Sequence, residues 1–405
     1  MTAKKTPVFL DRTTPPNIVT LVLITGMSAM VLNMFLPSLP TMTEYFQTEY
    51  RVMQLSVALY LGTVAMLQLL IGPLSDRYGR RPILLIGLGI FLLATIGCLL
   101  ATTAETFLLF RMIQATVGVT MVLSRAIARD MFEQSQAASM IGYITMGMAI
   151  IPMVSPAIGG YLDEAFGWQA NFRVFLVLGA LVFWLVWADV GETNEHRTSS
   201  FRQQFADYPE LLLSPRFWGY SMAAAFASGA FFAYLGGGPF VGSIVYGLPP
   251  SKLGLFFGAP AVGYMAGNFL SGRYSTRLGV NNMVLYGAMA LTAGLSASLV
   301  ISLLGFGSVY TFFGFMIFVG IGNGMILPNA TAGMLSVRPH LAGTASGLGG
   351  TIMMGGGAGL SVLAGAVLNP DSGPFPLLWL MLIVAVLAVF SILLVIRREK
   401  SQGIA

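Results

Sequence analysis

Long apolar runs, separated by short polar segments, divide this chain from end to end. Each run is close to the roughly 20 residues that an α-helix needs to cross a bilayer core of ~30 Å. Their apolar residues are continuous rather than alternating, which favours helices over the strands of a barrel. The twelve runs are residues 17–37, 52–74, 83–103, 106–128, 137–162, 170–190, 216–240, 252–272, 281–304, 308–334, 341–368 and 374–396. The pattern therefore predicts an all-α membrane protein with twelve transmembrane helices.

The composition agrees with a chain whose main solvent is lipid. Hydrophobic residues make up 56% and charged residues 9%, against about 25% charged in an ordinary soluble domain. The formal net charge is +5, but the basic residues fall in short loops rather than in one patch, so nucleic acid is not an expected partner. The single cysteine, Cys98, allows no disulfide within the chain; we expect it to pack in a helix.

Lysine and arginine are unevenly divided between alternate loops. One set of loops, with both termini, holds sixteen of them, whereas the other set holds Arg51, Arg173 and Lys252. Because cytoplasmic loops are enriched in basic residues, we expect both termini in the cytoplasm. The first run is too long for the apolar part of a signal peptide and lacks a small-residue cleavage site, so we expect no cleaved leader.

The most highly charged short connection is Gly72-Pro73-Leu74-Ser75-Asp76-Arg77-Tyr78-Gly79-Arg80-Arg81. We expect it to be a loop at the cytoplasmic surface, because such a segment cannot lie in hydrocarbon. A weaker copy, Leu270-Ser271-Gly272-Arg273-Tyr274, is followed by Arg277 and Gly279, and aligning Ser75 with Ser271 places Gly272 where the first copy has Asp76. The repetition predicts two six-helix pseudo-repeats. The predicted parts are a tail at 1–16, an N-terminal bundle at 17–190, a linker at 191–215, a C-terminal bundle at 216–396 and a tail at 397–405.

Several polar residues interrupt the apolar runs. An arginine such as Arg111 costs ~2.5–3.5 kcal/mol in a membrane helix on insertion scales, so it should face the protein interior or a water-filled cavity. The alternative is that its long side chain reaches the nearby interface. Asn33, Asn323 and Asn329 need hydrogen-bonding partners, either on a neighbouring helix or on a ligand.

Small and bending residues mark two further places. Pro152, Pro156, Gly159 and Gly160 lie in the fifth run, where such residues allow close helix packing and bending. Gly236-Gly237-Gly238-Pro239 lies at the end of the seventh run, and we expect the chain to be unwound or flexible there.

These motifs resemble those of a known family. The pattern Gly-x-Leu-x-Asp-Arg-x-Gly-Arg-Arg after the second run resembles the corresponding loop of the major facilitator superfamily. Arg111-x-x-Gln114 with Gly118 resembles its helix 4 motif, and Ser155-Pro156-Ala157-Ile158-Gly159-Gly160 resembles its antiporter motif, with Ser155 where glycine is usual. Residues 33–40, 124–130 and 328–330 are similar to the Bcr/CflA group of bicyclomycin and chloramphenicol resistance antiporters.

The resemblance implies export by alternating access, in which two six-helix halves rock about a central site. It implies a cytoplasmic gate formed by Gly72, Asp76, Arg77, Gly79, Arg80 and Arg81, and an interface between the halves formed by Pro152, Pro156, Gly159 and Gly160. We expect the substrate cavity to be lined by Asn33, Met34, Arg111, Gln114, Tyr143, Met146, Phe231, Tyr234, Asn323 and Asn329.

One position departs from the pattern of the group. Asn33 stands where an aspartate is common, and all sixteen acidic residues fall in loops or at helix ends. Proton coupling needs a group whose charge changes, so the candidates Asn33, Arg111 and Asp130 leave three alternatives open. Coupling runs through a peripheral acid such as Asp130, Asp163 or Asp189; or Asn33 is an engineered mimic of a protonated aspartate; or the protein is a facilitator without coupling.

The leading functional hypothesis is a monomeric exporter of small amphipathic compounds in a bacterial inner membrane, exchanging them for protons. An exporter or facilitator of one metabolite, such as a sugar or nucleoside, is the alternative. A membrane sensor that does not transport is a third hypothesis, but the sequence has no soluble signalling domain. The sequence contains no metal-ligand spacing, phosphate loop or nucleophile–base set, so we expect neither an enzyme nor a cofactor.

Overall fold

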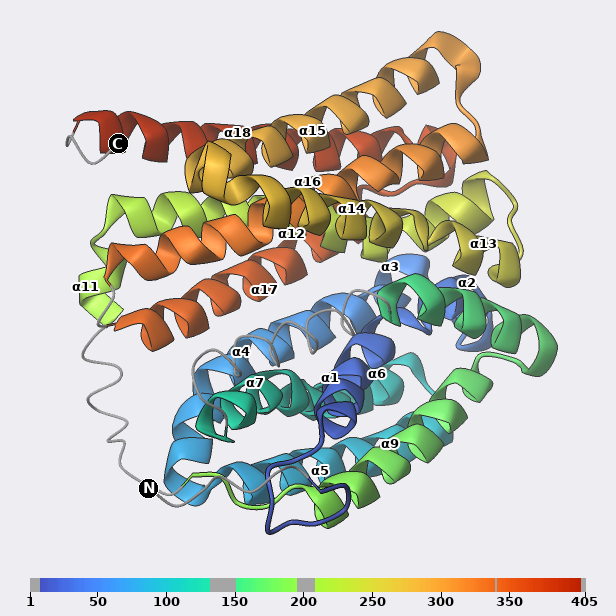
Figure 1. Ribbon diagram of the computed structural model, residues 1–405. Coiled ribbons are helices and arrows are strands. Elements are labelled where there is room, and N and C mark those ends of the chain that lie inside the picture. Colours follow the sequence, from blue (N-terminus) through green and yellow to red (C-terminus); the bar gives the residue numbers. More distant parts are fainter. Residues whose placement is uncertain (1–7, 132–150, 195–207, 339–340, 402–405) are drawn as a thin grey trace.

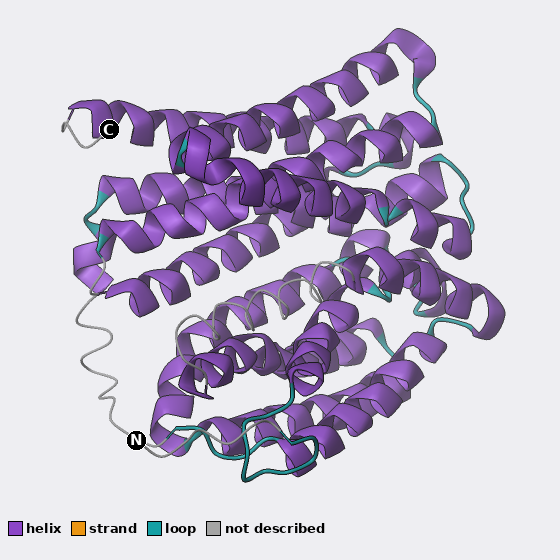
Figure 2. Ribbon diagram, in the orientation of Figure 1, coloured by secondary structure: helices purple, strands orange, loops and turns teal. Residues whose placement is uncertain are grey.

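The computed structural model describes residues 8–131, 151–194, 208–338 and 341–401, in which every regular element is a helix (Figures 1 and 2). Within these ranges, eleven helices are long and apolar enough to cross a membrane. The remaining one of the twelve predicted runs, the fifth at 137–162, begins among residues outside the described ranges, and its described part belongs to a helix at 151–166.

The helices gather into two bundles, drawn at the bottom and the top of Figure 1. The N-terminal bundle contains α1 (Ile18–Asn33), η1 (Leu36–Ser38), α2 (Leu39–Tyr45), α3 (Tyr50–Met53), α4 (Leu55–Tyr78), α5 (Arg80–Leu100), α6 (Ala104–Gln114), η2 (Ala115–Gly118), α7 (Val119–Met131), the helix at 151–166 and α9 (Gln169–Asp189). The C-terminal bundle contains α11 (Tyr208–Leu212), α12 (Pro215–Phe240), η3 (Val241–Val245), α13 (Pro250–Phe256), α14 (Ala259–Leu278), α15 (Val280–Ile301), η4 (Ser302–Phe306), α16 (Val309–Val337), α17 (Ala342–Val367), η6 (Pro370–Ser372) and α18 (Phe375–Ser401).

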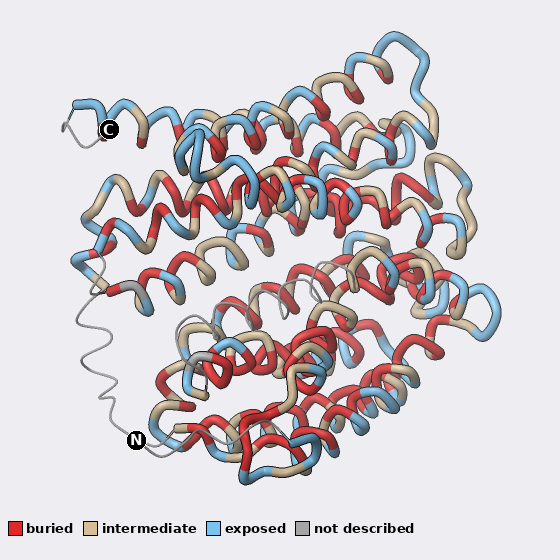
Figure 3. Tube along the Cα trace, viewed as in Figure 1, coloured by how far each residue is buried: buried red, intermediate tan, exposed pale blue. Residues whose placement is uncertain are grey.

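Both ends of the described chain lie on one side of the molecule, at the left of Figure 1. We call this side the termini end, and the opposite side, which carries α2, α3 and α13, the far end. Buried residues gather where helices face one another, and the outward faces stay apolar and exposed (Figure 3). Leu93 is 70% exposed and Phe306 is 75% exposed. Helices that are apolar on both faces fit a lipid environment.

Glycines let α14 and α16 approach each other closely in the C-terminal bundle. A Cβ atom on Gly263 would lie 1.9 Å from the Ile317 carbonyl oxygen, and one on Gly320 would lie 1.8 Å from that of Pro260. Side chains at these positions would force the backbones apart. The helices are therefore held by close van der Waals packing, which is the main source of helix association in a membrane.

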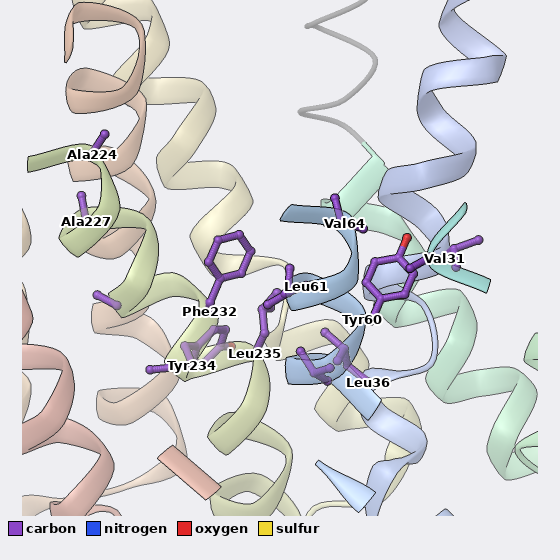
Figure 4. Packing of buried hydrophobic residues seen from close by; sticks show 14 of the residues in the cluster. Val31, Leu36, Tyr60, Leu61, Val64, Ala224, Ala227, Phe232, Tyr234 and Leu235 are labelled. Atoms are coloured by element: carbon purple, nitrogen blue, oxygen red, sulfur yellow. The ribbon is translucent and has the colours of Figure 1, made fainter. Parts of the chain in front are cut away.

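The two bundles meet most closely toward the far end. The Tyr50 hydroxyl donates to the Gly236 carbonyl at 2.7 Å, and Gln54 Nε2 donates to the Ser361 hydroxyl at 2.7 Å. Figure 4 shows apolar contact at the same interface, with Leu61 of α4 facing α12 of the other bundle. These contacts join α3 and α4 to α12 and α17.

The structure corrects the prediction of a loop at Gly72–Arg81. Helix α4 continues to Tyr78 and α5 begins at Arg80, so Gly79 alone forms the turn. Its φ of 104° lies in a region that favours glycine. The Gly79 N–H donates to the Ser75 carbonyl at 3.0 Å, which ends α4.

The second copy has the same turn, but in a different register from the predicted one. Gly279 has a φ of 82°, and its N–H donates to the Ser275 carbonyl at 2.9 Å. Gly79 therefore corresponds to Gly279, and Asp76 corresponds to Thr276 rather than to Gly272. The predicted alignment was wrong by one helical turn, because it matched Ser-x-Arg-Tyr letters instead of the glycine that makes the turn.

The expected unwinding at residues 236–239 is also wrong. Helix α12 runs through Pro239 to Phe240 and continues as a π-helical turn at Val241–Val245. All four residues from 236 to 239 are buried. Proline removes one helical hydrogen bond, and a local π-helical adjustment is one way in which a membrane helix satisfies the backbone groups that proline frees.

Candidate functional site

The turn at Gly79 carries a cluster of charges on three helices of one bundle. The Arg80 guanidinium contacts Asp76 Oδ1 at 2.5 Å and Asp130 Oδ2 at 3.1 Å, and it donates to the Ser75 hydroxyl at 2.5 Å. Arg80 is buried, and a buried arginine requires such partners. The structure thus brings together two predicted gate residues, Asp76 and Arg80, with the predicted coupling residue Asp130.

Glu192 completes this cluster, although the sequence analysis did not single it out. Its Oε1 accepts the backbone N–H groups of Arg80 at 2.9 Å, Thr193 at 3.0 Å and Asn194 at 3.0 Å. A Cβ atom on Gly79 would lie 2.2 Å from Glu192 Oε2. The carboxylate therefore sits at the N-terminus of α5, where the helix dipole favours a negative charge. The sequence signal that could have identified Glu192 is its position as an acid just after the apolar run 170–190.

The other predicted gate residues lie around the same turn. Arg81 Nε donates to the Val190 carbonyl at 2.8 Å, which ties α5 to the end of α9. The Arg77 guanidinium lies 5.4 Å from the centre of the Tyr78 ring. Gly72, one and a half turns earlier in α4, has open space where a Cβ would be.

Arg111 is fully enclosed in the N-terminal bundle, with an exposed fraction of 0%. Its Nη2 donates to the Val31 carbonyl of α1 at 2.8 Å, and its Nη1 donates to the side chain of Gln114. The guanidinium carbon lies 4.2 Å from the centre of the Phe35 ring and 4.4 Å from that of Tyr60. The alternative that Arg111 reaches the membrane interface is therefore wrong.

The neighbours of Arg111 hold one another in place. Gln114 Nε2 donates to the Thr95 hydroxyl at 2.8 Å, so α6 is joined to α5. Asn33 Nδ2 donates to the Ala29 carbonyl of its own helix at 2.7 Å. Met34 is buried, and its carbonyl oxygen would be 1.7 Å from a Cβ on Gly159. These four predicted cavity residues, Arg111, Gln114, Asn33 and Met34, are thus all packed inside the bundle.

In the C-terminal bundle the predicted asparagines bond neighbouring groups. Asn323 Nδ2 donates to the Ala227 carbonyl of α12 at 3.0 Å, and Asn329 Nδ2 donates to the Ser271 hydroxyl of α14 at 2.8 Å. The sequence left open whether these asparagines bond a neighbouring helix or a ligand. In the structure their amide nitrogens bond a neighbouring helix. Each also donates to a carbonyl of its own helix.

The predicted aromatic residues differ in their exposure. Tyr234 is buried and stacks on Phe257, with ring centres 4.8 Å apart. Phe231 is half-buried, and its ring centre is 5.9 Å from that of Phe232. Tyr143 and Met146 lie outside the described residues.

The helix at 151–166 brings its glycines against the other bundle. A Cβ atom on Gly160 would lie 2.1 Å from the Pro250 carbonyl of α13, and one on Gly254 would lie 2.2 Å from the Pro156 carbonyl. Pro152, half a helix earlier, is half-buried. Residues of the predicted antiporter motif thus form part of the contact between bundles.

Glu399 is a buried acid that the sequence analysis assigned to a C-terminal tail. It is 5% exposed, because α18 continues to Ser401 rather than ending near residue 396. Its carboxylate accepts hydrogen bonds from Arg216 of α12 at 2.5 Å, from Tyr220 at 3.2 Å and from Asn281 of α15 at 2.5 Å. Within the basic run Arg397-Arg398-Glu399-Lys400, nothing in the sequence signalled this network.

Asp189 holds the first part of the chain against the N-terminal bundle. It is buried at the end of α9, and it accepts the Leu10 N–H at 2.6 Å, the Asn17 N–H at 3.0 Å and the Thr20 hydroxyl at 2.6 Å. Described residues of the predicted 1–16 tail are therefore bound to the bundle.

The fold and these sites define a multi-pass helical membrane protein made of two interlocked bundles. The family model for the Major Facilitator Superfamily matches residues 21–361. The chain belongs to this superfamily, and it is a transporter of that family.

Relatives with drug-resistance names match most of the chain. A bicyclomycin resistance protein homolog of Haemophilus influenzae is 30% identical and aligns over 95% of this chain and 98% of its own. A chloramphenicol resistance protein of Pseudomonas aeruginosa is 30% identical over 81% of this chain and 79% of its own. Multidrug resistance protein D of Escherichia coli is 28% identical over 95% and 96%. The resemblance to the bicyclomycin and chloramphenicol resistance group is thereby confirmed.

Solved structures show the same fold at low sequence identity. A bacterial homolog of the human lysosomal transporter Spinster, in an inward-facing and occupied conformation, has a TM-score of 0.71 at 17% identity and covers 94% of this chain and 96% of its own. A variant of the nucleoside transporter NupG has a TM-score of 0.74 at 11% identity, covering 94% and 100%.

Proposed function

We propose that this transporter exports small amphipathic compounds across a bacterial inner membrane by alternating access. The observation that carries the proposal is the unequal contact between the bundles. Toward the far end they interlock through Tyr50, Gln54 and Gly160. At the termini end, the charges at Gly79 have their ion-pair partners, Asp76 and Asp130, within the N-terminal bundle. This arrangement is what a rocking carrier has when its far face is closed.

The proposal assigns twelve helices to two six-helix repeats with both termini in the cytoplasm. In that orientation the far end is extracytoplasmic, and the structure corresponds to the inward-facing state. The drug-resistance names of the relatives support export of foreign compounds. We retain a monomer, embedded in lipid, as the working unit.

The charges near the centre favour neutral or anionic substrates. Arg111 is buried in the N-terminal bundle, and Arg125 of α7 is exposed and interacts electrostatically with Tyr264 of α14 in the other bundle. All sixteen acids of the sequence fall in loops or at helix ends. Positive charges held inside the helices make the electrostatic potential around them positive, which attracts anions and repels cations. Within the proposed drug class, cationic compounds are therefore the poorer substrates.

The proton is the proposed coupling ion, although Asn33 cannot carry it. This departure favours a second candidate function, a facilitator of one metabolite without coupling through the first helix. Transport in proteoliposomes, with and without an imposed pH gradient, separates the two. A proton-coupled exporter should accumulate amphipathic compounds in response to the pH gradient. A facilitator should only equilibrate one polar compound, with or without the gradient.

The Asn33→Asp variant is the matched comparison for that experiment. It supplies a titratable group in the first helix, so the pH gradient should increase transport by this variant more strongly than transport by the wild type. Equal responses of both proteins would reject a role for position 33 in coupling. A panel of neutral, anionic and cationic amphipathic compounds of similar size tests the charge preference, and faster export of the cations would contradict it.

A further inference from the structure

Asp163 lies where the helix at 151–166 meets both bundles at the far end. One turn earlier, Gly159 packs against the Met34 carbonyl of α1's C-terminal end, and Gly160 packs against the Pro250 carbonyl of α13. The next residue, Glu164, accepts the Ser251 N–H across the interface at 3.3 Å. The Asp163 carboxyl is therefore beside the contact that closes the far face.

Only half of this carboxyl group is satisfied. Asp163 is 4% exposed; the Thr41 hydroxyl donates to its Oδ2 at 2.7 Å, whereas its Oδ1 accepts no hydrogen bond from any described residue. Asn171 of α9 is also buried, and its Nδ2 donates to the Ser38 hydroxyl at 3.0 Å and to the Gly159 carbonyl at 3.2 Å. Its Oδ1 likewise has no donor among the described residues. The cluster thus has two buried acceptors that need a donor.

The surroundings of Asp163 favour its neutral form. Burial raises the pKa of this carboxyl, which follows the predicted membrane run 137–162 directly; the hydroxyls of Thr41 and Ser38 oppose the rise, and the charge of Glu164 adds to it.

No described base neutralises the carboxylate. The charged groups on the adjoining elements are Glu44 of α2, Arg173 of α9 and Lys252 of α13, all of which are exposed, and none of the three forms a salt bridge with Asp163. Among the described side chains, no base therefore compensates the negative charge of an ionised Asp163.

The other peripheral acids named as coupling candidates are built differently. Asp130 forms an ion pair with Arg80, and Asp189 accepts three hydrogen bonds from Leu10, Asn17 and Thr20. Of these three acids, Asp163 alone has a buried oxygen without a donor.

We propose that Asp163 is a proton-binding site of the far end and that its protonated form stabilises the closed far face. The inference rests on the alternating access proposed above. With the face closed, the bound proton converts the unsatisfied Asp163 oxygen into an O–H group, so the buried carboxyl carries no uncompensated charge and the cluster gains one donor. When the face opens, water hydrates the carboxylate, and the proton leaves to the water on that side. No reactant besides one proton and water is involved.

A distance measurement across the far end tests this proposal on the full chain in lipid nanodiscs. Spin labels at Thr102→Cys and Tyr310→Cys, in a Cys98→Ala background, report the separation of the bundles; both positions are exposed. Lowering the pH from about 8 to about 5, a range that spans a raised carboxyl pKa, should shift the wild-type population to the short distance. Asp163→Asn, which carries a permanent donor, should keep the short distance throughout.

Two further variants make the result specific. Glu164→Gln should retain the pH response, since the neighbouring acid is not the proposed site. Thr41→Val removes the donor to Oδ2, so the pH-dependent change in distance should persist with its midpoint at higher pH. This variant also tests the site if Asp163→Asn does not fold. A pH response in Asp163→Asn equal to that of the wild type would overturn the proposal. So would a shift at fixed pH produced by sodium chloride but not by choline chloride, because the cluster would then bind a cation.

The distance measurement needs no transported compound, so it separates this proposal from the proposed export. A shift that depends on Asp163, in a protein that exports none of the panel, keeps the proton site and rejects drug export. A wild-type protein with one pH-independent distance rejects the proton site, even where transport of the panel succeeds.

Discussion

At the scale of single residues, Arg111 is held without an acid in contact with it among the described residues. A carbonyl oxygen, an amide and two aromatic rings surround its guanidinium. Cation–π contacts of desolvated groups contribute up to about 2 kcal/mol or more each, and hydrogen bonds to charged groups contribute roughly 1.5–3 kcal/mol. The planar guanidinium fits between the rings while it donates at its edge.

Arg111→Lys tests this arrangement while keeping the charge. A lysine ammonium cannot stack on both rings and also donate to Val31 and Gln114, so we expect the free energy of unfolding to fall by about 1–3 kcal/mol. Chemical unfolding in mixed micelles measures the change. Arg173→Lys, at an exposed position of α9, is the control and should be neutral. An Arg111→Lys protein as stable as the wild type would show that charge alone is needed.

At the scale of elements, the turns at Gly79 and Gly279 share one backbone geometry but differ in what surrounds them. Glu192 fills the space beside Gly79, whereas no described residue lies within 4 Å of a Cβ placed on Gly279. The first turn is thus fixed both by its φ angle and by a capping carboxylate, and the second by its φ angle alone.

The pair gives a matched prediction. Gly279→Ala should lower the free energy of unfolding by roughly 1–3 kcal/mol, which is the cost of a strained φ for a residue with a Cβ atom. Gly79→Ala should lower the free energy of unfolding by more than this, because its Cβ also displaces Glu192 and leaves the backbone N–H groups of Arg80, Thr193 and Asn194 without their acceptor. Unfolding of both variants under identical conditions checks the order, and equal losses would show that Glu192 moves without cost.

The glycine contact between α14 and α16 supports a second prediction at this scale. Gly263→Ala introduces a Cβ atom 1.9 Å from a backbone oxygen, so the two helices must separate and the protein should be destabilised by about 1–3 kcal/mol. Gly314→Ala, also in a helix but with no atom of the described part of the chain within 4 Å of the new Cβ, should be neutral or slightly stabilising. Thermal unfolding distinguishes the two variants, and equal effects would contradict the steric explanation.

At the scale of the whole molecule, the bundles are linked by polar contacts that a rocking motion has to break. Gln54 is central to them: its side chain is buried between Gly236 and Gly365, and its amide nitrogen donates to the Ser361 carbonyl and hydroxyl. Glycines at positions 236 and 365 make room for it. This interlock was not predicted, because Gln54 stands near the start of an apolar run with no sign of its partner.

Gln54→Ala should therefore shift the protein toward an open far face. The variant removes both hydrogen bonds to Ser361, each contributing about 0.5–1.5 kcal/mol, which changes the ratio of the two states by roughly tenfold. The distance between spin labels at positions 102 and 310 measures the ratio of the closed and open states. Thr63→Ala is the control, since among the described residues the Thr63 hydroxyl bonds only a carbonyl of its own helix. A matching shift in that variant would contradict the prediction.

The sequence predicted those features that depend on local composition. Run lengths predicted the membrane helices, and Arg111 was expected in the interior because an exposed charge in hydrocarbon is costly. Features that depend on distant partners were missed: Glu399 pairs with Arg216, 183 residues away, and its basic neighbours gave it the appearance of a solvated tail. The turn register was missed because one backbone angle at Gly279, rather than the surrounding letters, determines it.

The bonds that Asp189 makes also set an order of events during synthesis. Leu10 and Asn17 precede this acid by 179 and 172 residues, so at about 5–20 residues per second the ribosome reaches it roughly 10–30 s after the first segment has emerged. Helix α1 is therefore made long before its anchor exists. Closure of the N-terminal bundle has to wait for α9, and a nascent chain stopped before residue 189 leaves its first helix without that anchor.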